Sequence, residues 1–182
     1  MNELYHNLHQ DIIDRCLLGD AKAQFQLYKL YYKAMYNTCL RIVKEQQEAE
    51  DIMQEAFLAA FKSMHKYKGE VSFGAWLKRI VVNRSIDYLK KKKIDLCPID
   101  EKLYKLSNSD HNSDSELHLE QVEKVKKAMN QLPDGYRVIL NLYLLEGYDH
   151  EEISGILGIS GSTSRSQYSR AKKKLMELLE NV

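Results

Sequence analysis

Apolar residues recur along this chain at steps of three and four positions, the spacing that places them on one face of an α-helix. The first long example runs from Asp20 to Lys44 and contains neither Gly nor Pro. We expect a helix there whose wide buried face is formed by Phe25, Tyr28, Tyr32, Met35, Tyr36, Cys39 and Ile42. A second helix is expected over Glu48 to Tyr67, with a buried side formed by Met53, Phe57, Ala60, Phe61 and Met64.

A glycine-containing loop, KYKGEVSF, interrupts the pattern before a third helix. That helix is expected from about Phe73 to Lys92, with a buried stripe formed by Leu77, Ile80, Val81 and Tyr88. It ends in a run of lysines, Lys90 to Lys93, whose cations suit the negative end of the helix dipole. These elements predict an N-terminal helical domain over residues 1–93.

The helical periodicity disappears after Ile94, where Ser, Asn and Asp cluster in SNSDHNSDSE and Pro98 breaks any continuing helix. A structureless stretch of this length is uncommon inside one compact domain. The sequence therefore predicts two domains, residues 1–93 and 118–182, joined by a flexible acidic linker over residues 94–117.

The second domain begins with a helix that Pro133 brings to an end and that carries apolar residues at Val122, Val125, Met129 and Leu132. Another helix is expected from Tyr136 to Glu146, closed by Gly147. The fold predicted for the whole chain is all-α, with a bundle of three or four helices in the first domain.

The last segments have the spacing of a helix-turn-helix. Asp149 is a suitable N-cap for HEEISGILG, and a glycine turn at Gly158 leads to a final helix over roughly Ser162 to Leu179. One exposed face of that final helix is expected to carry Arg165, Ser166, Ser169 and Arg170. Such a face can read base edges and hold phosphates. A solvated lysine-rich surface is the alternative, and the tight turn before the helix favours DNA.

The composition agrees with an all-α fold, because 44% of the 182 residues are hydrophobic and only eight Gly and two Pro occur. No apolar run approaches the roughly 18 to 20 residues of a membrane-spanning helix, and the N-terminus lacks the order of a signal peptide. We therefore expect a cytoplasmic protein without direct membrane insertion. The three cysteines show no CxxC spacing, so reduced, buried thiols are expected.

The formal net charge of +1 conceals strongly opposed blocks. Basic residues concentrate just before the linker and again in the final helix, whereas acidic residues occupy the linker between them. Two basic patches with an acidic spacer indicate two contacts with a polyanion.

The helix from Phe73 to Lys92 offers a second candidate surface, on which an aromatic ring, cations, an amide and a carboxylate share one face: Trp76, Arg79, Asn83, Asp87 and Lys90. Interleaved aromatic and basic groups suit unstacked bases and their phosphates. The alternative, which the sequence leaves open, is that Trp76 belongs to the core and that Arg79 and Asp87 form structural ion pairs.

A third candidate surface lies on the helix from Glu48 to Tyr67, where Asp51, Gln54, Glu55 and Leu58 are adjacent. An apolar side chain flanked by acids suits a basic partner helix, although ordinary solvated surface is the simpler interpretation.

Catalytic patterns are absent, because DHEE is not HExxH and no P-loop or GxSxG is present. His111 and His118 could nominally bind a metal, but they fall in or beside the polar linker.

In this order the segments resemble an extracytoplasmic-function sigma factor, a promoter-recognition subunit of bacterial RNA polymerase. EAEDIMQEAFLAAFK resembles the region 2 helix that docks on the polymerase clamp, and FGAWLKRIVVNRSIDYLKK is similar to the segment that follows it. LPDGYRVILNLYLLEGYDHEEISGILGISGSTSRSQYSRAKKKL resembles region 4. Two departures from the family pattern, Ser154 and Ser164, make the packing of the final helix more polar.

The resemblance implies roles for each surface. The contacts with core polymerase would be Asp51, Gln54, Glu55 and Leu58. The minus-10 element would be opened and held by Tyr67, Lys68, Phe73, Trp76, Arg79, Asn83, Asp87 and Lys90, with the loop from Tyr67 to Phe73 pocketing a flipped base. The minus-35 element would be read as duplex by Thr163, Arg165, Ser166, Ser169, Arg170 and Lys173. The acidic linker would thread toward the RNA exit path.

The resemblance further implies an anti-sigma factor as a partner, no cofactor, no bound metal and no covalent step of catalysis. Two other interpretations remain open from the sequence. One is a stand-alone helix-turn-helix regulator whose N-terminal domain senses a signal or dimerises. The other is a helical enzyme that binds a metal or ligand through His111 and His118.

Overall fold

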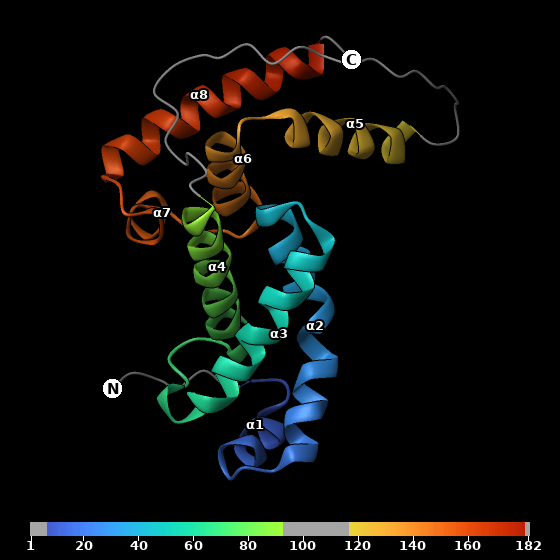
Figure 1. Ribbon diagram of the computed structural model, residues 1–182, viewed down its shortest axis with the longest axis vertical. Helices are drawn as coiled ribbons and strands as arrows, with labels where there is room; N and C mark the ends of the chain where they lie inside the picture. Colours follow the sequence, from blue (N-terminus) through green and yellow to red (C-terminus); the bar gives the residue numbers. More distant parts are fainter. Residues whose placement is uncertain (1–6, 93–116, 181–182) are drawn as a thin grey trace. The chain divides into compact units, whose positions relative to one another are not determined.

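The structure is a computed structural model that describes residues 7–92 and 117–180, and side chains in the second range from residue 121. Every regular element in these ranges is a helix, which confirms the all-α prediction (Figure 1). The chain divides into two compact units, of which the first ends at Lys92. The expected linker over residues 94–117 lies outside the described residues, except that Leu117 already begins a helix.

Unit 1 is a helical bundle in which α2, α3 and α4 pack against one another and α1 packs on α2. Its elements are α1 (Gln10–Leu17), α2 (Ala21–Val43), α3 (Gln46–Lys62), the 3₁₀ turn η1 (Met64–Lys66) and α4 (Phe73–Lys91). The helix expected over Glu48 to Tyr67 is therefore divided, because α3 ends at Lys62 and η1 follows. The other two predicted helices agree with α2 and α4 to within one residue at each end.

Short polar side chains cap α2 and α4 in unit 1. The Asp20 carboxylate accepts hydrogen bonds from the backbone N–H groups of Lys22 at 2.8 Å and Ala23 at 3.3 Å, which lowers the pKa of Asp20. Ser72 caps α4 in the same way. Between α2 and α3, Lys44 adopts a left-handed conformation with φ of 69°, which ends α2 without a glycine.

The core of unit 1 differs from the predicted one in α2. Phe25 is 57% exposed and Tyr32 is 44% exposed, so both expectations are wrong, and Ala23 and Leu27 are buried in their place. The Nζ atom of Lys29 lies 4.5 Å from the centroid of the Phe25 ring, so that ring meets a cation at the surface. The buried face of α2 therefore includes Ala23 and Leu27, and the rings of Phe25 and Tyr32 lie outside it.

The buried stripe of α4 is also shifted. Leu77 and Val81 are buried as predicted, but Ile80 and Tyr88 are only half-buried. The stripe is completed by residues that the prediction omitted, Val82, Ser85, Ile86 and Leu89. Because these occupy the inner face, the outer face of α4 is left to polar residues.

Unit 2 consists of α5 (Leu117–Gln131), α6 (Asp134–Leu140), the π-helical turn η2 (Asn141–Leu145), α7 (His150–Leu157) and α8 (Gly161–Glu180). Helix α8 packs against α5, α6 and α7. The expected helix over Tyr136 to Glu146 is present as α6 continued by η2, and Gly147 follows with φ of 79°. Of the apolar residues that mark α5 in the sequence, Val122 and Val125 are exposed and Leu132 is buried, together with Ala128.

A charged side chain lies in the centre of unit 2. Arg137 is 1% exposed and forms an ion pair with Asp134 one helical turn earlier. Burial lowers the pKa of the Arg137 guanidinium, and the Asp134 carboxylate opposes that shift. The pair fixes the start of α6 within the apolar core.

Cys16 and Cys39 are buried and unbridged, as the cysteine spacing predicts. Burial raises the pKa of the Cys16 thiol to about 11, so the neutral thiol is favoured at physiological pH.

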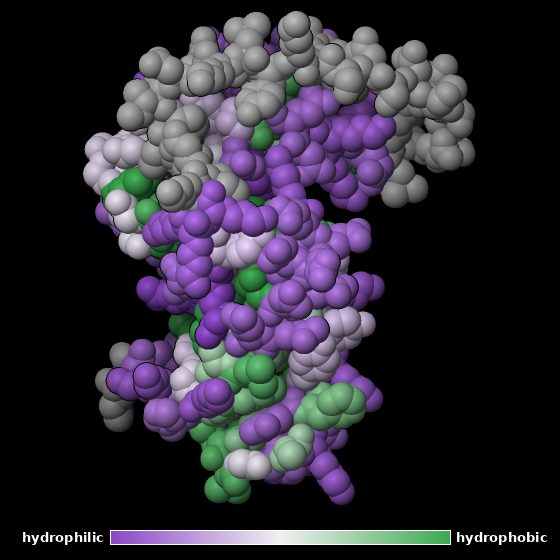
Figure 2. Space-filling model, viewed as in Figure 1, coloured by the Kyte–Doolittle hydropathy of each residue, from purple (hydrophilic) through white to green (hydrophobic). Residues whose placement is uncertain are grey.

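Apolar surface gathers at the end of unit 1 that carries α1 (Figure 2), and the exposed apolar side chains near α1 include Leu17, Leu18 and Phe25. Within the described ranges, no helix combines the length and apolarity needed to cross a membrane.

Candidate nucleic-acid interface

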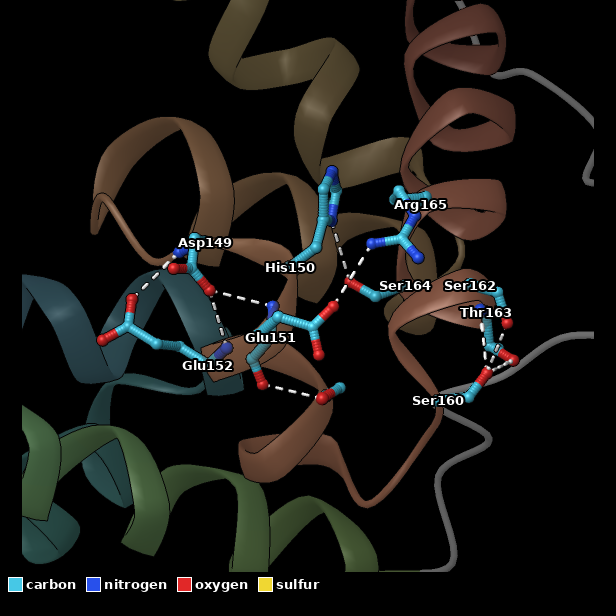
Figure 3. Close-up of polar contacts among 10 residues, drawn as sticks. Asp149, His150, Glu151, Glu152, Ser160, Ser162, Thr163, Ser164 and Arg165 are labelled. Carbon is cyan, nitrogen blue, oxygen red and sulfur yellow. Dashed lines mark hydrogen bonds and ion pairs between the residues drawn. The ribbon is translucent and has the colours of Figure 1, made fainter.

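Helix α7 is capped at both ends, and the contacts of Asp149 at its start are drawn in Figure 3. Asp149 Oδ1 accepts hydrogen bonds from the N–H groups of Glu151 and Glu152 at 2.8 Å, and Glu152 Oε2 accepts one from the Asp149 N–H at 3.0 Å. This reciprocal capping box confirms Asp149 as the predicted N-cap. Gly158 ends α7 with φ of 75°, a left-handed conformation that favours glycine.

The start of α8 is fixed by a cluster of hydroxyl groups (Figure 3). Ser160 Oγ accepts a hydrogen bond from the Thr163 N–H at 3.0 Å. The same oxygen lies 2.8 Å from the hydroxyl oxygens of Ser162 and Thr163. The rotation of α8 about its axis is therefore set within its first turn.

A polar contact joins α7 to α8 beneath the surface. Ser164 is fully buried, and its hydroxyl shares a 3.0 Å hydrogen bond with Nδ1 of His150. The His150 ring stacks on Tyr143 with centroids 4.7 Å apart and meets Tyr168 edge-on at 5.5 Å. The departure at Ser164 thus makes this packing more polar, as expected from the sequence.

The outer face of α8 presents the residues that the sequence singled out. Arg165, Ser166, Ser169, Arg170 and Lys173 are exposed, and Thr163 is half-buried. The face is a continuous helical surface of hydroxyl and cationic groups. This geometry suits insertion of α8 into a major groove.

Glu151 is a neighbour of this face that sequence reasoning missed. Arg165 Nη1 donates a hydrogen bond to Glu151 Oε1 at 3.3 Å across the turn (Figure 3). A Cβ atom at Gly161 would lie 2.5 Å from the same Oε1, so the absent side chain at Gly161 leaves room for the carboxylate. Glu151 therefore lies beside the start of α8, in contact with Arg165.

In unit 1 the outer face of α4 carries Arg79, Asn83, Asp87 and Lys90, all of them exposed. Trp76 is half-buried, with its ring centroid 5.4 Å from Tyr67 and 5.7 Å from Phe73. The Trp76 ring therefore packs on the core and retains an accessible part, and its contact with DNA stays a prediction. The exposed residues of α4 lie at the spacing of one helical face beside that ring.

In the loop before α4 two of the predicted minus-10 residues are buried. Phe73 is 0% exposed and Tyr67 is also buried, so neither ring is displayed at the surface. Their centroids are 5.7 Å apart in an edge-to-face arrangement beneath the loop. Lys68 is exposed, as predicted. The loop is supported by aromatic rings and offers its backbone and its polar side chains to solvent.

The candidate docking surface on α3 is exposed in all its members: Asp51, Gln54, Glu55 and Leu58. Leu58 is 61% exposed and lies among these polar side chains. Arg84 of α4 donates a hydrogen bond from Nη1 to Glu55 Oε2 at 2.9 Å. One of the predicted contacts is therefore already paired with a cation of its own unit.

Among the side chains that the structure describes, no group of three or more His, Cys, Asp and Glu is arranged to hold a metal ion. The side chains of His111 and His118 lie outside that part of the chain, so the metal interpretation gains no support from geometry.

Comparison with known proteins identifies both units. Residues 27–94 match the family model of sigma-70 region 2, and residues 123–175 match that of sigma-70 region 4. SigM of Bacillus subtilis, an ECF RNA polymerase sigma factor, is 31% identical over 154 residues, which are 84% of this chain and 93% of that protein. The sigma-H factor of Pseudomonas aeruginosa is 27% identical over 94% of this chain and 93% of its own length.

The fold is shared with solved structures as well. RpoE of Bartonella quintana, solved in complex with the anti-sigma factor NepR, has a TM-score of 0.57 at 22% identity, covering 85% of this chain and 95% of that one. CnrH, solved with the cytosolic domain of CnrY, has a TM-score of 0.56 at 21% identity, covering 93% and 96%. The matched relatives are sigma factors, which sets aside the stand-alone regulator. This chain belongs to the extracytoplasmic-function family of RNA polymerase sigma factors.

Proposed function

We propose that this sigma factor brings bacterial RNA polymerase to its promoters by reading one element as duplex through α8 and a second as an opened strand through α4 and its preceding loop. The observation that carries this proposal is the pair of exposed faces, one on each unit, within the segments that match regions 4 and 2. Each face has the chemistry that its own form of DNA requires.

The face of α8 supports duplex recognition. Arg165 and Arg170 are exposed five positions apart and flank Ser166 and Ser169 on the face of α8, and arginine pairs best with guanine in the major groove. Ser166, Ser169 and Thr163 supply hydroxyl groups for bases or phosphates, and Lys173 supplies a phosphate contact. This assigns the minus-35 element to unit 2.

The face of α4 supports capture of a single strand. Arg79 and Lys90 can hold phosphates, and Asn83 and Asp87 can hydrogen-bond exposed base edges. The accessible part of Trp76 lies at the end of this face, where it can stack on the last paired base. Lys68 and the loop backbone would accommodate an extruded base of the minus-10 element.

Opening the DNA in this way makes and breaks no covalent bond, so we assign no enzymatic activity to the chain itself. The free energy comes from binding the unstacked bases, whose extrusion costs a few kcal/mol each. No cofactor takes part. Transcription initiation by this protein would take place in the cytoplasm, where the polymerase and the DNA are.

The outer face of α3 would bind the polymerase. Asp51, Gln54 and Glu55 offer two carboxylates and an amide around the exposed Leu58, which suits a basic helical surface such as the clamp. Replacing Asp51 and Gln54 together by Ala should reduce co-elution with core polymerase about tenfold or more, as expected when two central polar contacts are lost. Glu50→Ala, an exposed acid on the same helix, is the matched control. Equal retention of the double variant, Glu50→Ala and the wild-type chain on core polymerase would contradict this assignment.

An anti-sigma factor is a further partner in this proposal. Bartonella RpoE, which shares the fold, is bound to the anti-sigma factor NepR in its structure. Exposed apolar side chains such as Leu58 offer surface that a repressing protein could cover. Expression of the chain with a tagged candidate anti-sigma factor should yield a complex that core polymerase cannot enter.

Transcription in vitro tests the proposed function directly. Purified chain added to heterologous core polymerase should produce transcripts from defined start sites in genomic DNA, and neither component alone should do so. A stand-alone regulator would instead bind duplex tightly without polymerase. Start sites that do not change when the chain is added would overturn the proposal.

A further inference from the structure

A buried asparagine outside the regions singled out by sequence meets both ends of the loop before α4. Asn7 precedes α1 and is 4% exposed. Its side chain bonds to Tyr67, where the loop begins, and to Phe73, where α4 begins. These partners lie 60 and 66 residues away in the sequence. One amide therefore closes the base of the loop.

At the first end, Asn7 Nδ2 donates a hydrogen bond to the Tyr67 hydroxyl at 2.9 Å. That hydroxyl in turn donates to the backbone carbonyl of Val71 at 2.8 Å. The chain of hydrogen bonds runs from the buried amide through the phenol to the interior of the loop. It fixes the loop backbone from beneath, because the Tyr67 ring itself is packed against Phe73 and Trp76.

At the second end, Asn7 Oδ1 accepts a hydrogen bond from the Phe73 N–H at 2.8 Å. Phe73 is the first residue of α4, so this N–H has no partner within the helix. Asn7 Nδ2 also donates to Gln10 Oε1 at 2.9 Å, which sets the orientation of the amide. Both polar atoms of the Asn7 side chain are thus engaged.

Between these anchors the loop turns outward. Lys68, Glu70 and Val71 are exposed, and Gly69 adopts a left-handed conformation with φ of 71°. The loop is short and is held at each end, so its exposed groups are displayed in one conformation before any ligand arrives. A loop that is ordered in advance loses less conformational entropy on binding.

We propose that Asn7 is a positioning residue for strand capture: it holds the loop from Tyr67 to Phe73 in the shape that receives an unstacked base. This inference rests on the proposed function of the loop and adds a residue to it. Asn7 does not touch DNA, and it acts through the Tyr67 hydroxyl and the first N–H of α4.

A purely structural role for Asn7 would be confined to the cap of α4, and the two roles can be separated. Asn7→Asp keeps an oxygen acceptor for the Phe73 N–H, and its negative charge suits a helix N-terminus. It cannot donate to Tyr67. Tyr67→Phe makes the complementary change, because it removes the hydroxyl and leaves the bond between Asn7 and Phe73. Asn37→Asp, on the exposed surface of α2, is the matched control.

The readout is binding of holoenzyme to a fluorescent single-stranded oligonucleotide with the non-template sequence of a promoter mapped with the wild-type chain. Asn7→Asp and Tyr67→Phe should each weaken this binding about five- to tenfold, the scale of one or two hydrogen bonds, and the double variant should be no weaker than Asn7→Asp. Affinity for core polymerase and for minus-35 duplex should stay at the control value. The midpoint of urea unfolding should fall in both variants, because each loses a buried hydrogen bond, so binding is compared where both variants are fully folded.

Each other outcome is decisive. If both variants bind the strand as tightly as the control, or if they lose core and duplex binding in parallel, the positioning role is wrong. Tyr67→Phe keeps the test valid should Asn7→Asp not fold, because it leaves the cap of α4 in place. If the wild-type holoenzyme maps to no promoter or does not bind the strand, the proposed function of the loop fails first, and this inference fails with it.

Discussion

The two candidate DNA surfaces are built in opposite ways. On α8 the residues proposed to meet DNA are exposed, apart from the half-buried Thr163, and the Ser160 hydroxyl caps the helix that carries them. In the loop before α4 the aromatic rings are buried, and they support the loop backbone from beneath. A duplex groove has a defined form that a helix surface can match, whereas an unstacked base needs a supported pocket. We therefore expect that substitutions in unit 1 can change the stability of the loop without changing the exposed groups proposed to contact DNA. In unit 2 the two effects should be harder to separate.

The largest effect should come from removing a supporting ring. Phe73→Ala should reduce the free energy of unfolding of unit 1 by about 3 to 5 kcal/mol, because the ring is fully buried between Tyr67 and Trp76. Urea unfolding can be followed by the fluorescence of Trp76, the single tryptophan of the chain. Phe25→Ala, at an exposed phenylalanine in the same unit, should cost less than about 1 kcal/mol. Similar losses for the two variants would break the distinction between support and surface.

A smaller effect is expected for the exposed arginines of α8. Arg165→Ala and Arg170→Ala should each reduce discrimination between the mapped minus-35 duplex and a scrambled duplex by about 1 to 3 kcal/mol, without loss of stability. Competition binding of holoenzyme measures this difference, with Lys124→Ala on α5 as a charge-matched control. Uniform weakening on both duplexes would assign the side chain to phosphate contact instead.

The cap of α8 provides a test of support within unit 2. Ser160→Ala should destabilise the first turn of α8 by about 1 kcal/mol, because the Thr163 N–H loses its acceptor. Faster hydrogen exchange in that turn, but not in α6, is the expected measurement. Ser160→Asn restores a good N-cap and should return exchange to the wild-type rate. Unchanged exchange in Ser160→Ala would show that the hydroxyl cluster does not hold the helix start.

The smallest effect concerns the ion pair beside the reading face. Glu151 and Arg165 are both exposed, so Glu151→Gln should change stability by less than about 1 kcal/mol. It should raise affinity for scrambled duplex a few-fold, because a carboxylate is removed from beside the phosphates and Arg165 is released. Gly161→Ala, which displaces the same carboxylate, should act in the same direction. Opposite signs for the two variants would exclude a role for Glu151 in orienting Arg165.

Most helices could be predicted from the sequence because apolar periodicity and capping residues are properties of neighbouring residues. Helices α2, α4 and α8 begin or end within two residues of their predicted limits, and the caps at Asp149 and Gly158 follow from residue type. The errors arose where tertiary packing selects among apolar residues. Phe25 and Tyr32 share the periodicity of a buried face, but the helices that pack on α2 cover Ala23 and Leu27 instead.

The missed functional residues share a different cause. Glu151 contacts Arg165 across a turn, and Asn7 contacts Tyr67 over 60 residues of sequence, so neither contact leaves a periodic signal. A polar residue near the start of a chain is ordinary in composition, and only its burial shows that it has partners. The surfaces were therefore predictable from residue type and spacing, whereas the residues that hold them required the fold.

The shared core of α2, α3 and α4 has a consequence for how new promoter preferences can arise. Because these helices form one bundle, and Arg84 and Glu55 join α3 to α4 across its surface, the proposed attachment of polymerase through α3 would set the direction in which α4 points. Outward residues of α4 could then change while the proposed anchoring residues of α3 stay constant. One bundle would in this way combine a constant attachment face with a variable reading face.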